Sequence, residues 1–120
     1  MKYLLMIYMN PTIFEGLSED EQQAIMDAHE DFQKPIRASG ELVGFAALAD
    51  PSASATVRVR EGVAAVTDGP YVEAKEFLAG YYVVSCETPE RAHELAALLP
   101  DAELTAIEVR PVMESGGMEM

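Results

Sequence analysis

Residues 3–9 are apolar on both of the faces that alternate along an extended chain. A strand with this pattern is buried on both sides, so it lies in the middle of a sheet whose two faces are both covered. The pattern therefore predicts that the chain is built around this segment as a central strand. One face would carry Tyr3, Leu5, Ile7 and Met9, and the other Leu4, Met6 and Tyr8.

The same segment resembles the start of a signal peptide, because Lys2 precedes the apolar run. The run is short, however, Asn10-Pro11 ends it, and no small-residue cleavage site follows. No stretch approaches the ~20 apolar residues of a membrane span. The single cysteine, Cys86, has no partner for an internal disulfide, which is typical of a reducing compartment. We therefore expect a cytoplasmic protein in which Cys86 acts as a small hydrophobe.

Capping signals mark two helices. Ser18-Glu19-Asp20-Glu21 is a capping box that starts the first helix, Pro35 predicts a kink near its end, and Gly40 stops it. Thr88 followed by Pro89 starts the second helix, and Pro100 ends it. Apolar residues at helical spacing predict the buried faces, which are Ile25, Ala28, Phe32 and Ile36 on the first helix and Ala92, Leu95, Ala96 and Leu99 on the second.

Further strands are predicted over residues 41–48, 78–86 and 104–110. Residues 56–60 and 63–67 flank Glu61-Gly62, which suits a two-residue hairpin turn. In the hairpin, two valines alternate with two arginines, so we expect one covered face and one solvated face. Asp68-Gly69-Pro70 predicts a turn, and residues 73–77 a single helical turn before the next strand.

The elements follow the order β-α-β, an inserted hairpin, and again β-α-β. That order is typical of the ferredoxin-like α+β fold, with its split βαβ pattern. It predicts one domain over residues 1–113 and a flexible tail over residues 114–120. Two helices cover only one face of the sheet, while the other face still carries large apolar side chains. We therefore expect a homodimer formed on the uncovered face.

Several segments, in the right order, are similar to one known family. Residues 67–76, TDGPYVEAKE, resemble the DGPF signature, and Ala79-Gly80-Tyr81 resembles the Gly-Gly-aromatic step that follows it. Residues 38–42, 56–62 and 108–112 resemble the family's flanking segments. The chain thus resembles the YCII-related (DGPF-domain) family over nearly its whole length. Tyr71, Ala74 and Ala79 depart from the signature, which usually has Phe, Thr and Gly there.

This resemblance implies a dimeric α+β barrel, in which two sheets pack face to face, and a His/Asp site. His29 lies on the apolar face of the first predicted helix, where an imidazole can act as general base or as a packed structural residue. Asp68 begins the D-G-P turn, where it can hold the turn, orient His29 or handle a proton. We take His29 and Asp68 as the candidate catalytic pair.

Arg58, Arg60 and Tyr71 are the candidate substrate-binding residues. The two arginines share one strand face, where they can clamp a carboxylate or form a solvated surface. No metal-ligand spacing, phosphate loop or dinucleotide fingerprint occurs, so we expect no metal and no cofactor. The net charge of −13 argues against nucleic acid and anionic membranes as partners.

Two functions are consistent with these observations. The first is a cofactor-free isomerase or lyase that uses the His/Asp pair on a small metabolite. The second is a non-catalytic module that binds a ligand or partner and is linked to transcription control, a setting that the resemblance implies because genes of the family often lie near sigma-factor genes. The geometry of the pocket distinguishes the two functions. Catalysis requires the acid–base groups to converge on one cavity, whereas a binding module requires only a cavity.

Overall fold

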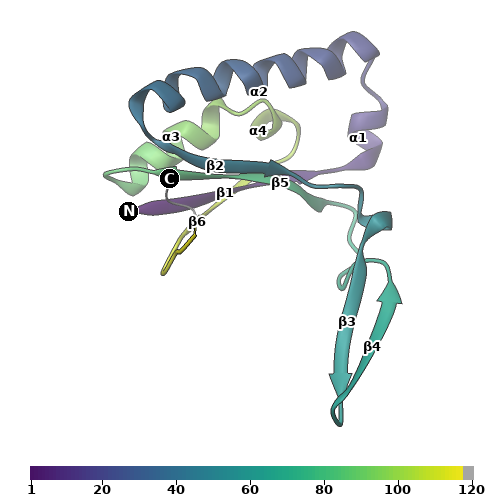
Figure 1. Cartoon of the computed structure of the whole chain (residues 1–120). Helices are drawn as coiled ribbons and strands as arrows, with labels where there is room; N and C mark the ends of the chain where they lie inside the picture. Colours follow the sequence, from purple (N-terminus) through teal and green to yellow (C-terminus); the bar gives the residue numbers. More distant parts are fainter. Residues whose placement is uncertain (118–120) are drawn as a thin grey trace.

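The computed structural model describes residues 1–117. Its centre is a four-stranded antiparallel sheet in the order β2-β5-β1-β6 (Figure 1). The two inner strands are β1 (Lys2–Met9) and β5 (Phe77–Ser85), and the edges are β2 (Leu42–Ala47) and β6 (Ile107–Pro111). The segment that is apolar on both faces is thus central, as predicted. The mixed α+β architecture agrees with the ferredoxin-like order of elements.

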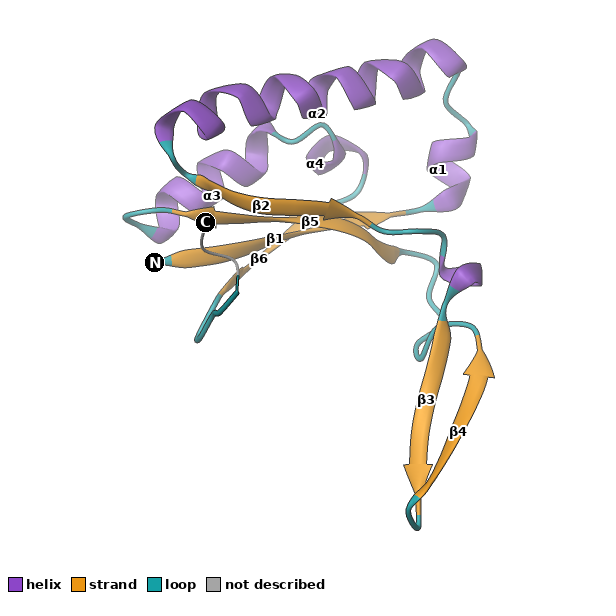
Figure 2. Cartoon of the chain, viewed as in Figure 1, coloured by secondary structure: helices purple, strands orange, loops and turns teal. Residues whose placement is uncertain are grey.

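Helices cover one face of this sheet (Figure 2). The long helix α2 (Glu19–Ser39) and helix α3 (Pro89–Leu98) lie on that face, and two short helices, α1 (Pro11–Glu15) and α4 (Asp101–Leu104), complete the layer. Between the layers lies a core whose most buried side chains include Leu5, Ile36, Val84, Leu95 and Leu99. Cys86 belongs to this core, as predicted, and its burial raises the pKa of the thiol.

The helix boundaries confirm the capping signals. Ser18 Oγ accepts from the Glu21 N–H, and the Glu21 carboxylate accepts from the Ser18 N–H, each at 3.1 Å. The helix α2 runs through Pro35 and ends at Gly40, whose φ of 83° is left-handed. Thr88 caps α3, with Pro89 in its first turn. Among the described residues, no helix is long and apolar enough to cross a membrane.

Within residues 1–117, no helix lies on the opposite face of the sheet (Figure 1). The strand register places large apolar side chains there, namely Leu4, Met6, Tyr8, Tyr81 and Val83. Most of them are only partly buried within the chain. In the part of the chain that the structure describes, the second face of the central strand therefore has no covering layer.

Strands β3 (Ala55–Arg60) and β4 (Val63–Asp68) form the predicted hairpin, which follows the short 3-10 turn η1 (Pro51–Ala53). Both residues of its turn have positive φ, 51° at Glu61 and 78° at Gly62, as a two-residue hairpin requires. The hairpin projects away from the helices as an arm (Figure 1).

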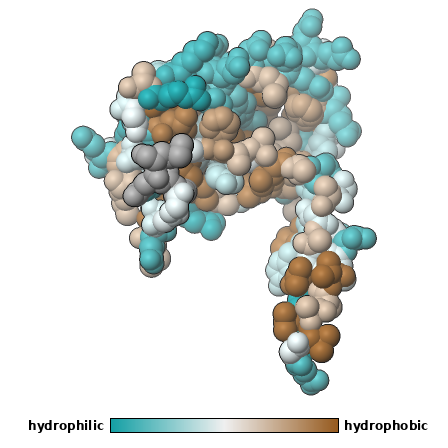
Figure 3. All heavy atoms as spheres, in the orientation of Figure 1, coloured by the Kyte–Doolittle hydropathy of each residue, from teal (hydrophilic) through white to brown (hydrophobic). Residues whose placement is uncertain are grey.

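The strand register gives this arm an apolar face and a polar face. Val57 pairs with Val66 and Val59 with Ala64, and these four residues form the apolar face, while Arg58 and Arg60 lie on the other. The predicted alternation is therefore present. The expectation that the apolar face is covered is wrong within a single chain, because Val57, Val59 and Val66 remain 58–66% exposed. Figure 3 shows hydrophobic residues gathered on the surface of the arm.

Two local predictions were wrong. Residues 73–77 form no helical turn, and β5 begins at Phe77. Residues 104–106 are not strand, because the turn of α4 is completed by the Thr105 N–H, which donates to the Asp101 carbonyl at 2.9 Å. The flexible tail remains a prediction. Lys2 Nζ donates to Ser115 Oγ at 3.1 Å, and residues 118–120 lie outside the described residues.

Gly80 allows β2 and β5 to pack closely. A Cβ atom at this position would lie 2.7 Å from the carbonyl oxygen of Ala46, which is backbone and cannot move aside cheaply. We expect Gly80→Ala to destabilise the protein by about 1–3 kcal/mol, measured by urea unfolding. Gly44→Ala in the neighbouring strand is the matched control, because a Cβ there meets nothing within 4 Å. Equal stabilities for the two variants would contradict this account.

Candidate functional site

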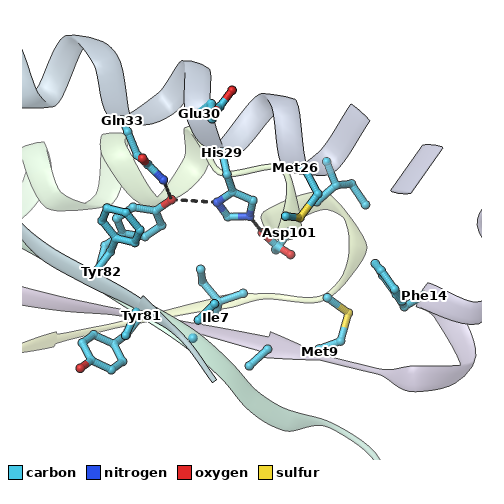
Figure 4. A pocket seen from close by; sticks show the side chains of 16 residues that line it. Ile7, Met9, Phe14, Met26, His29, Glu30, Gln33, Tyr81, Tyr82 and Asp101 are labelled. Atoms are coloured by element: carbon cyan, nitrogen blue, oxygen red, sulfur yellow. Dashed lines mark hydrogen bonds and ion pairs between the residues drawn. The ribbon is translucent and has the colours of Figure 1, made fainter. Parts of the chain in front are cut away.

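His29 points from α2 toward the sheet and is held from two sides (Figure 4). Its Nε2 lies 2.7 Å from Oδ2 of Asp101, the first residue of α4. The side chain of Asp101 is 3% exposed, whereas that of His29 is 20% exposed. Because a buried carboxylate needs a charged or hydrogen-bonded partner, this contact fixes the imidazole in place.

The second ring nitrogen of His29 contacts a phenol. Nδ1 lies 2.9 Å from the hydroxyl of Tyr82 on β5, and the two rings stack with their planes 9° apart. Gln33, one turn further along α2, donates to the same hydroxyl at 3.0 Å. Burial raises the pKa of Tyr82. The hydrogen bond from Gln33 lowers this pKa, and the nearby negative charge of Asp101 raises it further. Tyr82 is therefore a neutral phenol at neutral pH.

These polar groups form part of the wall of a cavity of about 340 Å³ between α2 and the sheet (Figure 4). Its volume is at the lower end of the range of small-molecule sites. Most of the remaining wall is apolar, from residues that include Ile7, Met9, Phe14, Ile25, Met26 and Phe45. Glu30 is also part of the lining and is exposed on α2. The arrangement can hold a small, largely apolar compound beside an imidazole and a phenol.

Asp68 is not the partner of His29 within one chain. It ends β4 in the arm, pairs with Ala55 there, and is exposed. Both ring nitrogens of His29 are instead bonded to Tyr82 and Asp101, so the predicted pairing does not form inside the chain. The physical reason is that Asp68 lies in the separate two-stranded sheet, on the arm that projects away from the helices. A role for Asp68 across a dimer remains a prediction.

The three candidate substrate-binding residues also lie on or beside the arm. The Arg58 guanidinium sits 5.5 Å from the centre of the Tyr71 ring, while Arg60 donates to the Val59 carbonyl at 3.0 Å. Tyr71 helps to line a second hollow, at the base of the arm, together with Asp50, Glu73 and Glu76. None of the three lines the His29 cavity, so their role in binding remains a prediction.

Asp101 and Gln33 were not identified from the sequence as residues of the site. Gln33 had a usable signal, because it stands four residues after His29 and so lies on the same helical face. Asp101 had none, since it follows Pro100 at a helix end where an acidic residue is ordinary. No three His, Cys, Asp or Glu side chains are grouped to hold a metal ion within residues 1–117.

Comparison with known proteins adds to this geometry. The profile of the YCII-related domain matches residues 1–115. The chain belongs to the YCII-related family. An uncharacterized protein of Rhizobium meliloti (strain 1021) is 31% identical to this YCII-related chain over 114 residues, which cover 93% of the chain and 92% of that protein. The family predicted from the sequence is thus confirmed.

The fold of the YCII-related chain is similar to a solved structure across the full length of both proteins. That structure is a 5-chloro-2-hydroxyhydroquinone dehydrochlorinase from Burkholderia phenoliruptrix AC1100, in complex with 2,5-dihydroxybenzoquinone. The TM-score is 0.56 and the sequence identity is 13%, with 100% of each chain covered. At this identity the similarity concerns the fold alone.

Proposed function

We propose that this YCII-related domain is a cofactor-free isomerase or lyase that moves a proton on a small, ring-derived metabolite. One observation carries the proposal. The His29 imidazole lies on an apolar cavity and is hydrogen-bonded through Nε2 to the buried Asp101 carboxylate. A carboxylate in that position orients the base and stabilises the imidazolium that forms when the base takes a proton. Asp101 thus has the role that the sequence predicted for Asp68.

The cavity favours a neutral, flat substrate with an acidic hydroxyl group or an acidic carbon next to a carbonyl. Its largely apolar wall suits a ring, and its polar groups suit a single ionisable oxygen. The net charge of −13, with Glu30 in the lining, disfavours a substrate that is already an anion. The hydroxylated quinone bound by the structurally similar dehydrochlorinase supports a hydroxylated ring as the substrate class.

The reaction needs no oxidant or reductant. The substrate gives up a proton for which His29 is the final acceptor, and it becomes an anion whose electron pair is delocalised over the ring. The imidazolium then returns the proton to another atom, which completes an isomerisation. Alternatively, the electron pair expels a leaving group with its bonding electrons, which completes an elimination.

We also propose that the protein is a cytoplasmic homodimer. The helix-free face of the sheet and the apolar face of the arm are both left without a cover in one chain. A partner that covered both would bury apolar side chains that are otherwise in contact with water, which is the main driving force for association. In such a dimer, Asp68, which lies on the same face of β4 as Val66, faces the partner subunit.

The alternative is a module that binds a ligand or partner without turnover and is linked to transcription control. The observation that favours it is that both nitrogens of His29 already have hydrogen-bond partners. A histidine of this kind also occurs as a structural residue in a binding pocket.

A thermal-shift screen against hydroxylated benzenes and quinones tests the proposed function. A ligand whose free concentration is 100 times its dissociation constant stabilises the folded state by about 2.7 kcal/mol. True ligands therefore raise the melting temperature. We expect the wild type to convert one such ligand, His29→Ala to bind without converting it, and His93→Ala, which changes the exposed histidine of α3, to behave as wild type. Stabilisation by ligands that the wild type never converts would instead support the binding module.

A further inference from the structure

One assignment of donors and acceptors satisfies all the hydrogen bonds around His29 when its imidazole is neutral. An ionised carboxylate only accepts, so the Asp101 contact requires the proton of the neutral imidazole to be on Nε2. Nδ1 is then an acceptor, and the Tyr82 hydroxyl donates to it. The Gln33 amide donates to the Tyr82 oxygen and completes the chain Gln33–Tyr82–His29–Asp101.

The phenol oxygen in this chain retains one acceptor position. A hydroxyl has one O–H and two lone pairs. In Tyr82 the O–H is directed to His29, and one lone pair accepts from Gln33. Tyr82 and Gln33 both line the cavity, so a molecule bound there can approach the second lone pair. Nδ1 of His29, by contrast, is already taken by the phenol.

We propose that Tyr82 is the catalytic residue that contacts the substrate, and that His29 acts through it. The substrate proton moves to the Tyr82 oxygen as the Tyr82 proton moves to Nδ1 of His29. The O–H or C–H bond of the substrate and the original O–H bond of Tyr82 break, while a new O–H bond and an N–H bond form. Tyr82 ends unchanged, the substrate becomes an anion, and His29 becomes an imidazolium paired with Asp101.

The inference rests on the proposed function and adds two features to it. Gln33 is a positioning residue, because its amide holds the phenol oxygen and stabilises the negative charge that passes through it. The buried Tyr82 is a neutral donor at rest, so the relay begins only when a substrate supplies a proton. The site therefore selects weakly acidic phenols and enols over compounds that merely fit the cavity.

The tautomer of His29 gives a test that needs no substrate. Long-range proton–nitrogen NMR spectra of nitrogen-labelled protein report which ring nitrogen carries the proton. We expect it on Nε2 in the wild type, and we expect Tyr82→Phe to shift the Nδ1 resonance. Tyr3→Phe is the matched control, since Tyr3 and Tyr82 are both 3% exposed and lie on the same face of the sheet. A neutral His29 that carries its proton on Nδ1 would overturn the relay.

Para-nitrophenol provides the second test, because its anion absorbs visible light and its neutral form does not. At a pH where the free probe is mainly neutral, we expect saturating wild-type protein to ionise it. We expect Tyr82→Phe to lower the acid dissociation constant of the bound probe about ten- to hundredfold, since one hydrogen bond to a charged group is lost. Tyr3→Phe should match the wild type. If Tyr82→Phe fails to fold, Gln33→Met tests the same oxygen and should lower the constant in the same direction.

The outcomes separate the relay from the proposed function. If His29→Ala abolishes ionisation of para-nitrophenol while Tyr82→Phe retains it fully, the relay is wrong and His29 acts directly on the substrate. If the wild type leaves the probe neutral, both the relay and the proposed function are contradicted. Ionisation that depends on both residues supports the relay.

Discussion

Asp101→Asn is expected to lower turnover of the ring compound identified by the screen about a hundred- to ten-thousandfold, the usual contribution of general acid–base catalysis. The amide has the same shape as the carboxylate, so it can keep the contact of 2.7 Å with His29 Nε2. The amide has a donor NH₂ group and an acceptor oxygen, and where the NH₂ group faces Nε2 the imidazole must accept there and carry its proton on Nδ1. The direction of the hydrogen bonds to Tyr82 is thereby reversed, and the imidazolium loses its counter-charge.

The rate is measured by the disappearance of the ring absorbance, and the thermal melting of each variant shows whether the fold is kept. Glu103→Gln is the control, because it makes the same change from carboxyl to amide on an exposed residue of the same short helix. It should leave the rate unchanged. If a folded Asp101→Asn variant keeps the wild-type rate, Asp101 has only a structural role and the proposed mechanism is wrong.

Val66→Asp is expected to convert a dimer into a monomer. Val66 lies on the apolar face of the arm with Val57, and its side chain is 66% exposed within one chain. If a partner covers this face, an aspartate there loses its hydration, which is costly for an unpaired charge. We expect the dissociation constant to rise by at least about a hundredfold, as for a central interface residue. Light scattering at micromolar concentration should then give one 13.1 kDa chain instead of two.

The arm itself contains the control for this experiment. Val63→Asp makes the same change in the same strand at a residue of almost equal exposure, 68%, but Val63 pairs with Arg60 on the polar face. It should leave the dimer intact. A wild-type protein that is monomeric at micromolar concentration would contradict the proposed homodimer. Equal dissociation of the two variants would contradict the assignment of the apolar face to the interface.

The elements that the sequence predicted correctly are those with local causes. The capping box at Ser18, the left-handed stop at Gly40 and the turn at Glu61-Gly62 each depend on a few neighbouring residues, and each is present in the structure. The central strand was predicted because its side chains are apolar on both faces. The two local errors, in residues 73–77 and 104–106, concern short segments where propensity is weak and packing decides.

The residues of the candidate site also divide into one that local sequence placed and others that it did not. Helical spacing alone directed His29 toward the sheet, because its neighbours Ile25 and Phe32 face the core. The partner of His29 was not accessible to such reasoning, since Asp101 lies 72 positions further along the chain and Tyr82 lies 53. Only the antiparallel pairing of β5 with β1, and the turn that brings α4 back over the sheet, place both beside His29. Local sequence patterns were enough to place most of the elements and to direct the imidazole toward the sheet. Which carboxylate and which phenol the imidazole meets depends on the fold, because these contacts join side chains that packing, and not proximity along the chain, brings together.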